Sequence, residues 1–66
     1  MTLNEIWNIE AITKPCVITR LGSTFLLRAK FGEDFYEAEL LVTNSAGFSY
    51  EGKRILRSDA DDWALE

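Results

Sequence analysis

The stretch that decides the fold is Thr24–Val42, TFLLRAKFGEDFYEAELLV, in which two runs of mainly apolar residues flank Gly32-Glu33-Asp34. Alternation of apolar and polar residues with a period of two indicates a β-strand, and a short glycine-containing loop between two such runs indicates a β-hairpin. The sequence therefore predicts strands at Thr24–Phe31 and Phe35–Val42, joined by a tight loop.

The register of this hairpin follows from its side-chain pattern, and we predict that Phe31 pairs with Tyr36. The remaining predicted pairs are Lys30–Glu37, Ala29–Ala38, Arg28–Glu39, Leu27–Leu40 and Phe25–Val42. All the apolar pairs then lie on one face, and two pairs of opposite charge lie on the other. A slip of one residue would set Ala29 against Glu37 and Lys30 against Tyr36, which mixes the two faces.

The strands on either side of this hairpin extend it into an antiparallel meander. Cys16–Leu21 reads as a preceding strand, and Gly22-Ser23 fits a two-residue type II′ turn, with glycine at its first position. After a loop at Thr43–Gly47, a further strand begins at Phe48–Tyr50. Glu51-Gly52-Lys53 is either a tight turn into a fifth strand, Arg54–Arg57, or a glycine bulge within one longer strand.

Both ends of the chain carry helix-start signals. Thr2 and Glu5 stand at capping-box spacing, which favours a helix over Thr2–Ile12 that ends before Lys14-Pro15. The alternation of Trp7, Ile9 and Ala11 would also suit a strand. At the other end, Ser58 and Asp61 repeat the capping spacing and predict a short helix within Ser58–Glu66.

The expected architecture is a single α+β domain over residues 1–66, a four- to five-stranded antiparallel β-meander with a short C-terminal helical segment. The N-terminal helix is expected to pack on one face of the sheet, its Leu3, Ile6 and Trp7 meeting the strand residues Phe25, Leu27, Leu40 and Val42. The second face would carry Val17, Leu21, Leu26 and Leu41. Either the C-terminal segment, through Trp63 and Leu65, or a partner covers that face.

The composition argues against an enzyme, a metal site or a bound cofactor. The 66 residues include no histidine and one cysteine, so Cys16 has no imidazole to activate it and no second thiol to pair with. The N-terminus lacks the pattern of a signal peptide, and no apolar run approaches the length of a membrane span. We therefore expect a cytoplasmic protein that acts by binding.

Acidic residues outnumber basic ones by eleven to seven, and they supply the candidate binding site. We select the acidic residues of the hairpin loop and the tail, with one aromatic residue as a possible anchor if it is partly exposed: Glu33, Asp34, Asp59, Asp61, Asp62, Trp63 and Glu66. Carboxylates at the start of a helix also stabilise that helix, so the tail has a purely structural interpretation too. Glu37 and Glu39 are weaker candidates because bases oppose them in the predicted register.

A nucleic-acid-binding function has some support in the bases that follow Phe48 and Tyr50, namely Lys53, Arg54 and Arg57. Aromatic and basic residues on a sheet can stack and hold single strands. The net charge of −4 opposes this interpretation, and both aromatic residues are also expected in a core.

In size, in acidity, in its Asp59-Ala60-Asp61-Asp62-Trp63 tail and in its Glu33-Asp34 loop, the chain resembles the anti-CRISPR proteins, small inhibitors that phages and mobile elements encode. In length and character it is similar to the type I-C inhibitors in particular. The resemblance implies mimicry of DNA by an acidic surface that blocks the DNA channel of a CRISPR effector complex in the host cytoplasm. The alternative is a small protein–protein adaptor or antitoxin-like module, homodimeric through Val17, Leu26 and Leu41.

Overall fold

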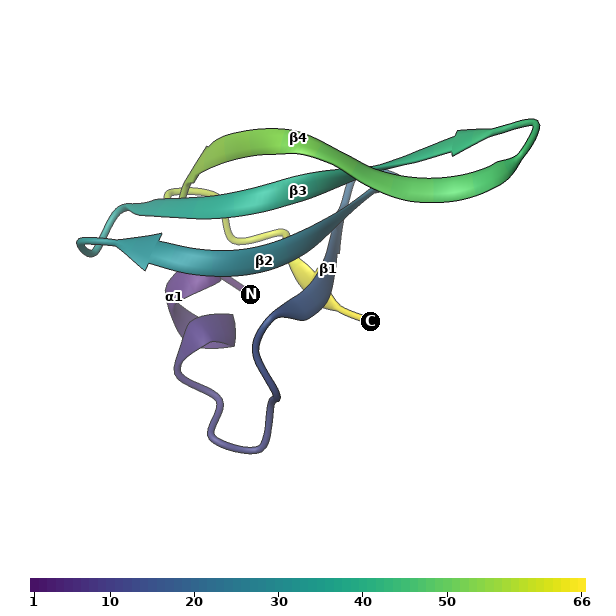
Figure 1. The fold of residues 1–66 in the computed structure, drawn as a ribbon. Coiled ribbons are helices and arrows are strands. Elements are labelled where there is room, and N and C mark those ends of the chain that lie inside the picture. The colour runs from purple at the N-terminus through teal and green to yellow at the C-terminus, as the bar shows by residue number, and fades with distance from the viewer.

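A computed structural model describes residues 1–66, which form a five-stranded antiparallel sheet and one short helix (Figure 1). The elements are α1 (Leu3–Trp7), β1 (Cys16–Arg20), β2 (Ser23–Phe31), β3 (Phe35–Asn44), β4 (Gly47–Arg57) and β5 (Ala64–Leu65). In the sheet the strands follow the order β4-β3-β2-β1-β5. The predicted meander of four strands is confirmed, and the protein is mostly β. The helix is too short to span a membrane.

The predicted register of the β2–β3 hairpin is wrong. Phe31 pairs with Phe35 across a three-residue loop, and Leu27 pairs with Ala38. The ladder shifts between Leu27 and Ala29, so Arg28 is an extra residue in β2, a β-bulge. The slip that we had rejected, with Lys30 opposite Tyr36, therefore occurs beyond the bulge.

The bulge preserves one part of the predicted face assignment and reverses another. Before the bulge, the observed pairing of β2 with β3 is shifted by two residues from the predicted pairing. A shift of two keeps every side chain on its face, so Phe25 and Leu27 face α1 as expected. After the bulge, Phe31 turns to the opposite face and Lys30 turns inward, its ammonium 5.9 Å from the centre of the Tyr36 ring.

The core lies between α1 and the sheet. It consists of eight buried residues contributed by the helix, the three central strands and the tail: Leu3, Ile6, Cys16, Ile18, Leu27, Tyr36, Ala38 and Trp63. Trp7 packs at its margin, with ring centroids 5.8 Å from Tyr36, and the Tyr36 hydroxyl donates to the Asn4 amide oxygen. The predicted packing of Leu3, Ile6 and Trp7 on the face that carries Leu27 is confirmed.

The β1–β2 turn differs from the prediction, and the alternative left open at Glu51-Gly52-Lys53 is settled. The β1–β2 turn has Leu21 and Gly22 at its centre, with φ of 50° and 80°, as in a type I′ turn, and Arg20 pairs with Ser23. The ambiguity at Glu51-Gly52-Lys53 resolves as a bulge, because β4 is one strand whose register shifts there. Gly52 has a φ of 68°, which glycine adopts without strain.

The N-terminal helix is shorter than predicted. The capping box is present, with the Thr2 hydroxyl accepting from the Glu5 amide and the Glu5 carboxylate accepting from the Thr2 amide. The helix nevertheless stops at Trp7, and residues 8–15 form an irregular segment. Asn8, Ile9, Ile12 and Thr13 all have modest helix propensity, so a good N-cap does not propagate the helix.

The predicted C-terminal helix does not form. Ser58 caps no helix; its amide and hydroxyl bond to the carbonyls of Asp34 and Glu33 instead. Trp63 exchanges backbone hydrogen bonds with Met1, and Ala64–Leu65 adds a fifth strand beside β1. Long-range backbone pairing and burial of Trp63 therefore outweigh the local capping signal.

The face of the sheet turned away from α1, here called the outer face, has no element over it (Figure 1). Trp63 and Leu65, which we had considered as its cover, pack with the core on the helix side. The strand pairing places Val17, Leu26 and Leu41 on the outer face, as predicted. It also places several large apolar side chains there that remain exposed to solvent: Phe31, Phe35, Phe48 and Ile55.

Leu27→Ala is expected to lower the free energy of unfolding by about 2–5 kcal/mol, because Leu27 is fully buried and its loss leaves a cavity. The matched control is Ile55→Ala, since Ile55 is also a strand aliphatic but 62% exposed, and it should cost less than about 1 kcal/mol. Urea unfolding followed by circular dichroism measures both. Equal costs would contradict the core described here.

Leu21→Asn should stabilise the protein. Leu21 is 81% exposed and sits at a positive φ, which costs a β-carbon-bearing residue about 1–2 kcal/mol and costs asparagine less. The expected result is a rise in the denaturant midpoint without a change in the m-value. A lower midpoint would show that the turn has a different conformation.

Candidate functional site

The β2–β3 loop and the start of the tail, 25 residues apart in sequence, meet at one end of the molecule. The Ser58 amide donates to the Asp34 carbonyl at 2.9 Å, and the Ser58 hydroxyl donates to the Glu33 carbonyl at 3.3 Å. Ser58 itself is buried, whereas the side chains of Glu33, Asp34 and Asp59 are exposed. Two predicted acidic segments are thereby fixed side by side.

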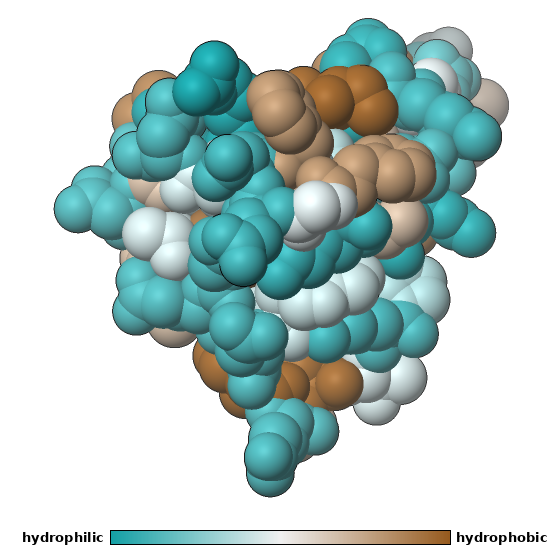
Figure 2. Space-filling view, turned by 90° about the vertical axis from the view of Figure 1, so that its left-hand side faces the viewer, coloured by the Kyte–Doolittle hydropathy of each residue, from teal (hydrophilic) through white to brown (hydrophobic).

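We call the exposed residues Glu33, Asp34 and Asp59 the acidic end. Figure 2 views the molecule from this side, where hydrophilic side chains cover most of the surface and apolar ones show near the upper edge and in a second patch lower down. Glu33 and Asp34 have no ion-pair partner, while Asp59 lies 3.5 Å from the Arg57 guanidinium. The charge at this end is therefore negative but partly balanced.

The remaining predicted site residues lie elsewhere. Asp62 pairs with Arg20 at 2.5 Å, and Glu66 lies at the rim of a hollow on the outer face. Trp63 is only 5% exposed, so it is part of the core and cannot serve as an exposed anchor for a partner. Asp61 is exposed, and its carbonyl oxygen accepts a hydrogen bond from the Met1 ammonium. The structure brings together three of the seven predicted residues and separates the other four.

The ion pairs on the outer face join residues that are not directly opposite each other in the strand pairing. Arg28 meets Glu39 as predicted, at 3.5 Å, but Glu37 pairs with Lys53 of β4, at 3.2 Å, and not with Lys30. Glu37 and Glu39 are therefore both neutralised by bases. This row of carboxylates does not add to the acidic end.

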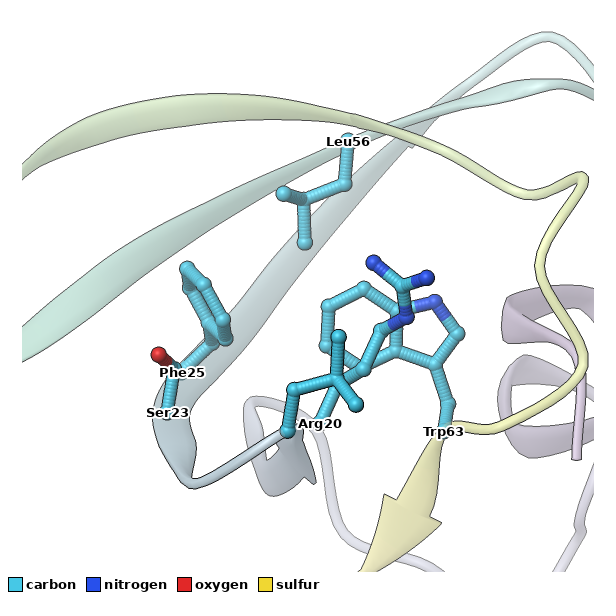
Figure 3. Close-up of a pocket in the computed structure, with 6 residues that line it drawn as sticks. Arg20, Ser23, Phe25, Leu56 and Trp63 are labelled. Carbon is cyan, nitrogen blue, oxygen red and sulfur yellow. The ribbon is translucent and has the colours of Figure 1, made fainter.

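A small hollow of about 190 Å³ opens beside Trp63 and is lined by Arg20, Leu21, Ser23, Phe25, Leu56 and Trp63. Figure 3 shows the Arg20 guanidinium beside the Trp63 indole, 5.7 Å from its ring centre. The indole Nε1 is buried and has no hydrogen-bond partner. The Arg20 Nε atom donates to Asp62, so the guanidinium is held at the rim of this hollow.

Burial and hydrogen bonding shift the pKa values of Cys16, Tyr36 and Glu5. Burial raises the pKa of the Cys16 thiol and the pKa of the Tyr36 hydroxyl, so both stay protonated at neutral pH. The capping hydrogen bond from the Thr2 amide lowers the pKa of Glu5. No group of three histidine, cysteine, aspartate or glutamate side chains is placed to hold a metal ion.

Sequence reasoning missed the far end of the β3–β4 hairpin. Phe48 was expected in a core, yet it is 73% exposed, close to the turn that joins the two strands. The signal that could have found this segment is the run Leu40–Tyr50, eleven residues without a charge in a chain that is 27% charged.

Comparison with protein-family models, with curated proteins and with solved structures finds no match to this chain.

The Asp62 carboxyl should titrate below its ordinary pKa of 3.8, because the Arg20 guanidinium donates a hydrogen bond to its ionised form. A depressed pKa means that this contact stabilises the fold above pH 3.8 and that its contribution disappears as the pH falls through the lowered value. Carboxyl ¹³C shifts measured against pH give this pKa directly. In Arg20→Gln it should return toward 3.8; an unchanged titration would show that Arg20 and Asp62 do not pair in solution.

Proposed function

We propose that this protein is a non-catalytic inhibitor that inserts its acidic end into a basic, nucleic-acid-binding groove of a partner protein. The observation that supports the proposal is the junction held by Ser58, which fixes the Glu33-Asp34 loop against Asp59. A surface that imitates a nucleic acid needs carboxylates on a rigid support, because freely moving side chains lose entropy on binding.

The balance of charge supports the same proposal. Four of the eleven acidic side chains pair with bases, which leaves seven acidic and three basic side chains without an ion-pair partner. This excess of negative charge favours approach to a basic groove and disfavours approach to nucleic acid itself. The resemblance to anti-CRISPR proteins makes a CRISPR effector complex the partner class that we propose, with the chain excluding target DNA.

The proposal is tested by the double charge reversal Glu33→Lys/Asp34→Lys. The measurement is target-DNA binding by a purified type I-C effector complex, followed by fluorescence anisotropy as the protein is added. The wild type should displace DNA, and the double variant should lose this effect while its circular dichroism is unchanged. Raising the salt concentration should weaken inhibition mainly by slowing association, because exposed charges are screened beyond about 8 Å at physiological ionic strength.

The matched control is Glu10→Lys/Glu51→Lys, which changes the net charge equally at two exposed positions outside the acidic end. This control should inhibit nearly as well as the wild type. If both double variants lose inhibition to the same degree, total charge and not the acidic end is responsible. If the Glu33→Lys/Asp34→Lys protein inhibits fully, the acidic end has no part in binding.

A second candidate function, a protein–protein adaptor or antitoxin-like module, is favoured by one observation, the uncovered outer face. Phe31 and Phe35 pair across the β2–β3 ladder, and Ile55 lies on β4 near them, all with exposed side chains. Exposed apolar patches on small proteins commonly mark interaction sites. This function needs no acidic end, so the Glu33→Lys/Asp34→Lys variant would retain it.

A further inference from the structure

The β3–β4 hairpin extends beyond the rest of the sheet. β2 pairs with β3 only as far as Phe25 opposite Leu40, whereas β3 and β4 continue to pair out to Asn44 opposite Gly47. Residues Leu41–Tyr50, here called the arm, are therefore a two-stranded ribbon whose outer edges have no neighbour. Figure 1 shows the arm projecting away from the helix and from β1.

The arm is unprotected against association, unlike the remainder of the same edge strand. Natural edge strands are commonly guarded by charges and bulges. The part of β4 after the arm has both, since it carries Glu51, Lys53 and Arg54 around the Gly52 bulge. The arm itself has no charged residue at all. A two-stranded ribbon is marginally stable alone in water, so an uncharged arm that exposes a large aromatic side chain benefits from a surface to pack on.

A hollow lies at the base of the arm on the outer face, where β3 separates from β2. It has a volume of about 440 Å³ and is lined by Val17, Thr24, Leu41, Phe48, Tyr50 and Glu66. One molecule therefore presents an exposed aromatic side chain, Phe48, on the wall of a hollow whose other lining residues are mainly apolar, with Thr24 and Glu66 as the polar ones. A two-fold axis next to the arm would let the Phe48 ring of each copy enter the hollow of the other, which is an isologous contact.

We propose that the protein forms a homodimer through the arm, with Phe48 of each copy seated in the partner's hollow. The absence of charge on the arm favours a second copy over a partner recognised electrostatically. The small core favours it too, since only nine of 66 residues are buried, and small domains without disulfides or metals often gain stability by association. The interface would need about 600 Å² from each copy, roughly a seventh of the 4340 Å² surface.

The dimer does not rest on the acidic end. Ten-residue β3 runs from Phe35, next to the β2–β3 loop, to Asn44 in the arm, a length of about 30 Å. A dimer joined at the arms would therefore leave both acidic ends free. The proposed dimer also leaves free the exposed patch of Phe31, Phe35 and Ile55 that favours the second candidate function.

The test is sedimentation equilibrium of the wild type, Phe48→Ser and Ile55→Ser over a wide concentration range. The wild type should pass from the monomer mass of 7.5 kDa to twice that mass. Phe48→Ser should weaken the dimer by at least about tenfold, as expected for a central aromatic contact. Ile55→Ser removes an exposed apolar side chain from the same strand and face outside the arm, and should dimerise like the wild type.

A wild type that stays monomeric, equal effects of the two substitutions, or assemblies that keep growing with concentration would each overturn the proposal. A second measurement does not depend on variants. In a sample mixed from isotope-labelled and unlabelled protein, intermolecular nuclear Overhauser effects should join the Phe48 ring of one copy to the Leu41 and Val17 methyls of the other. A dimer without these contacts uses another surface. Neither result bears on inhibition by the acidic end, which is measured separately.

Discussion

One extra residue in β2 determines which face of the sheet the following side chains occupy. Arg28 is left out of the ladder between Leu27 and Ala29, so the apolar alternation that begins at Phe25 is inverted after the bulge. Tyr36 keeps its place in the core beneath Lys30, and Phe31 moves to the outer face, where Phe35 lies in either register. The bulge thus brings the two exposed aromatic side chains onto one face near the acidic end.

The core lies on only one side of the sheet, the side that carries α1. A five-residue helix and the buried Trp63 cover the same face, and the tail closes that side by pairing with both Met1 and β1. Nothing in the chain remains to cover the other face. The long hairpin of β3 and β4 joins two ends of different chemistry. One end is acidic and is held by the hydrogen bonds of Ser58. The other is the uncharged arm, which has no neighbouring strand beyond Leu40.

Local patterns predicted local features well. The meander, the Thr2–Glu5 capping box and the burial of Leu3, Ile6 and Leu27 all follow from alternation or from fixed spacings. The register failed because charge pairing across the hairpin, which suggested Lys30 with Glu37, contributes less than about 1 kcal/mol and can be satisfied by Lys53 from the next strand. The C-terminal helix failed because Ser58 and Trp63 have distant backbone partners that no local pattern records. For the same reason the sequence identified the acidic residues but not which of them meet.

Interstrand nuclear Overhauser effects between backbone protons of β2 and β3 test the bulged register most directly. The expected contacts pair Leu27 with Ala38, and then Lys30 with Tyr36 beyond the bulge. Continuous contacts that pair Leu27 with Leu40 and Ala29 with Ala38 would contradict it. In that case Phe31 would face α1, and the outer face would lose the aromatic pair on which its interpretation as a binding surface depends.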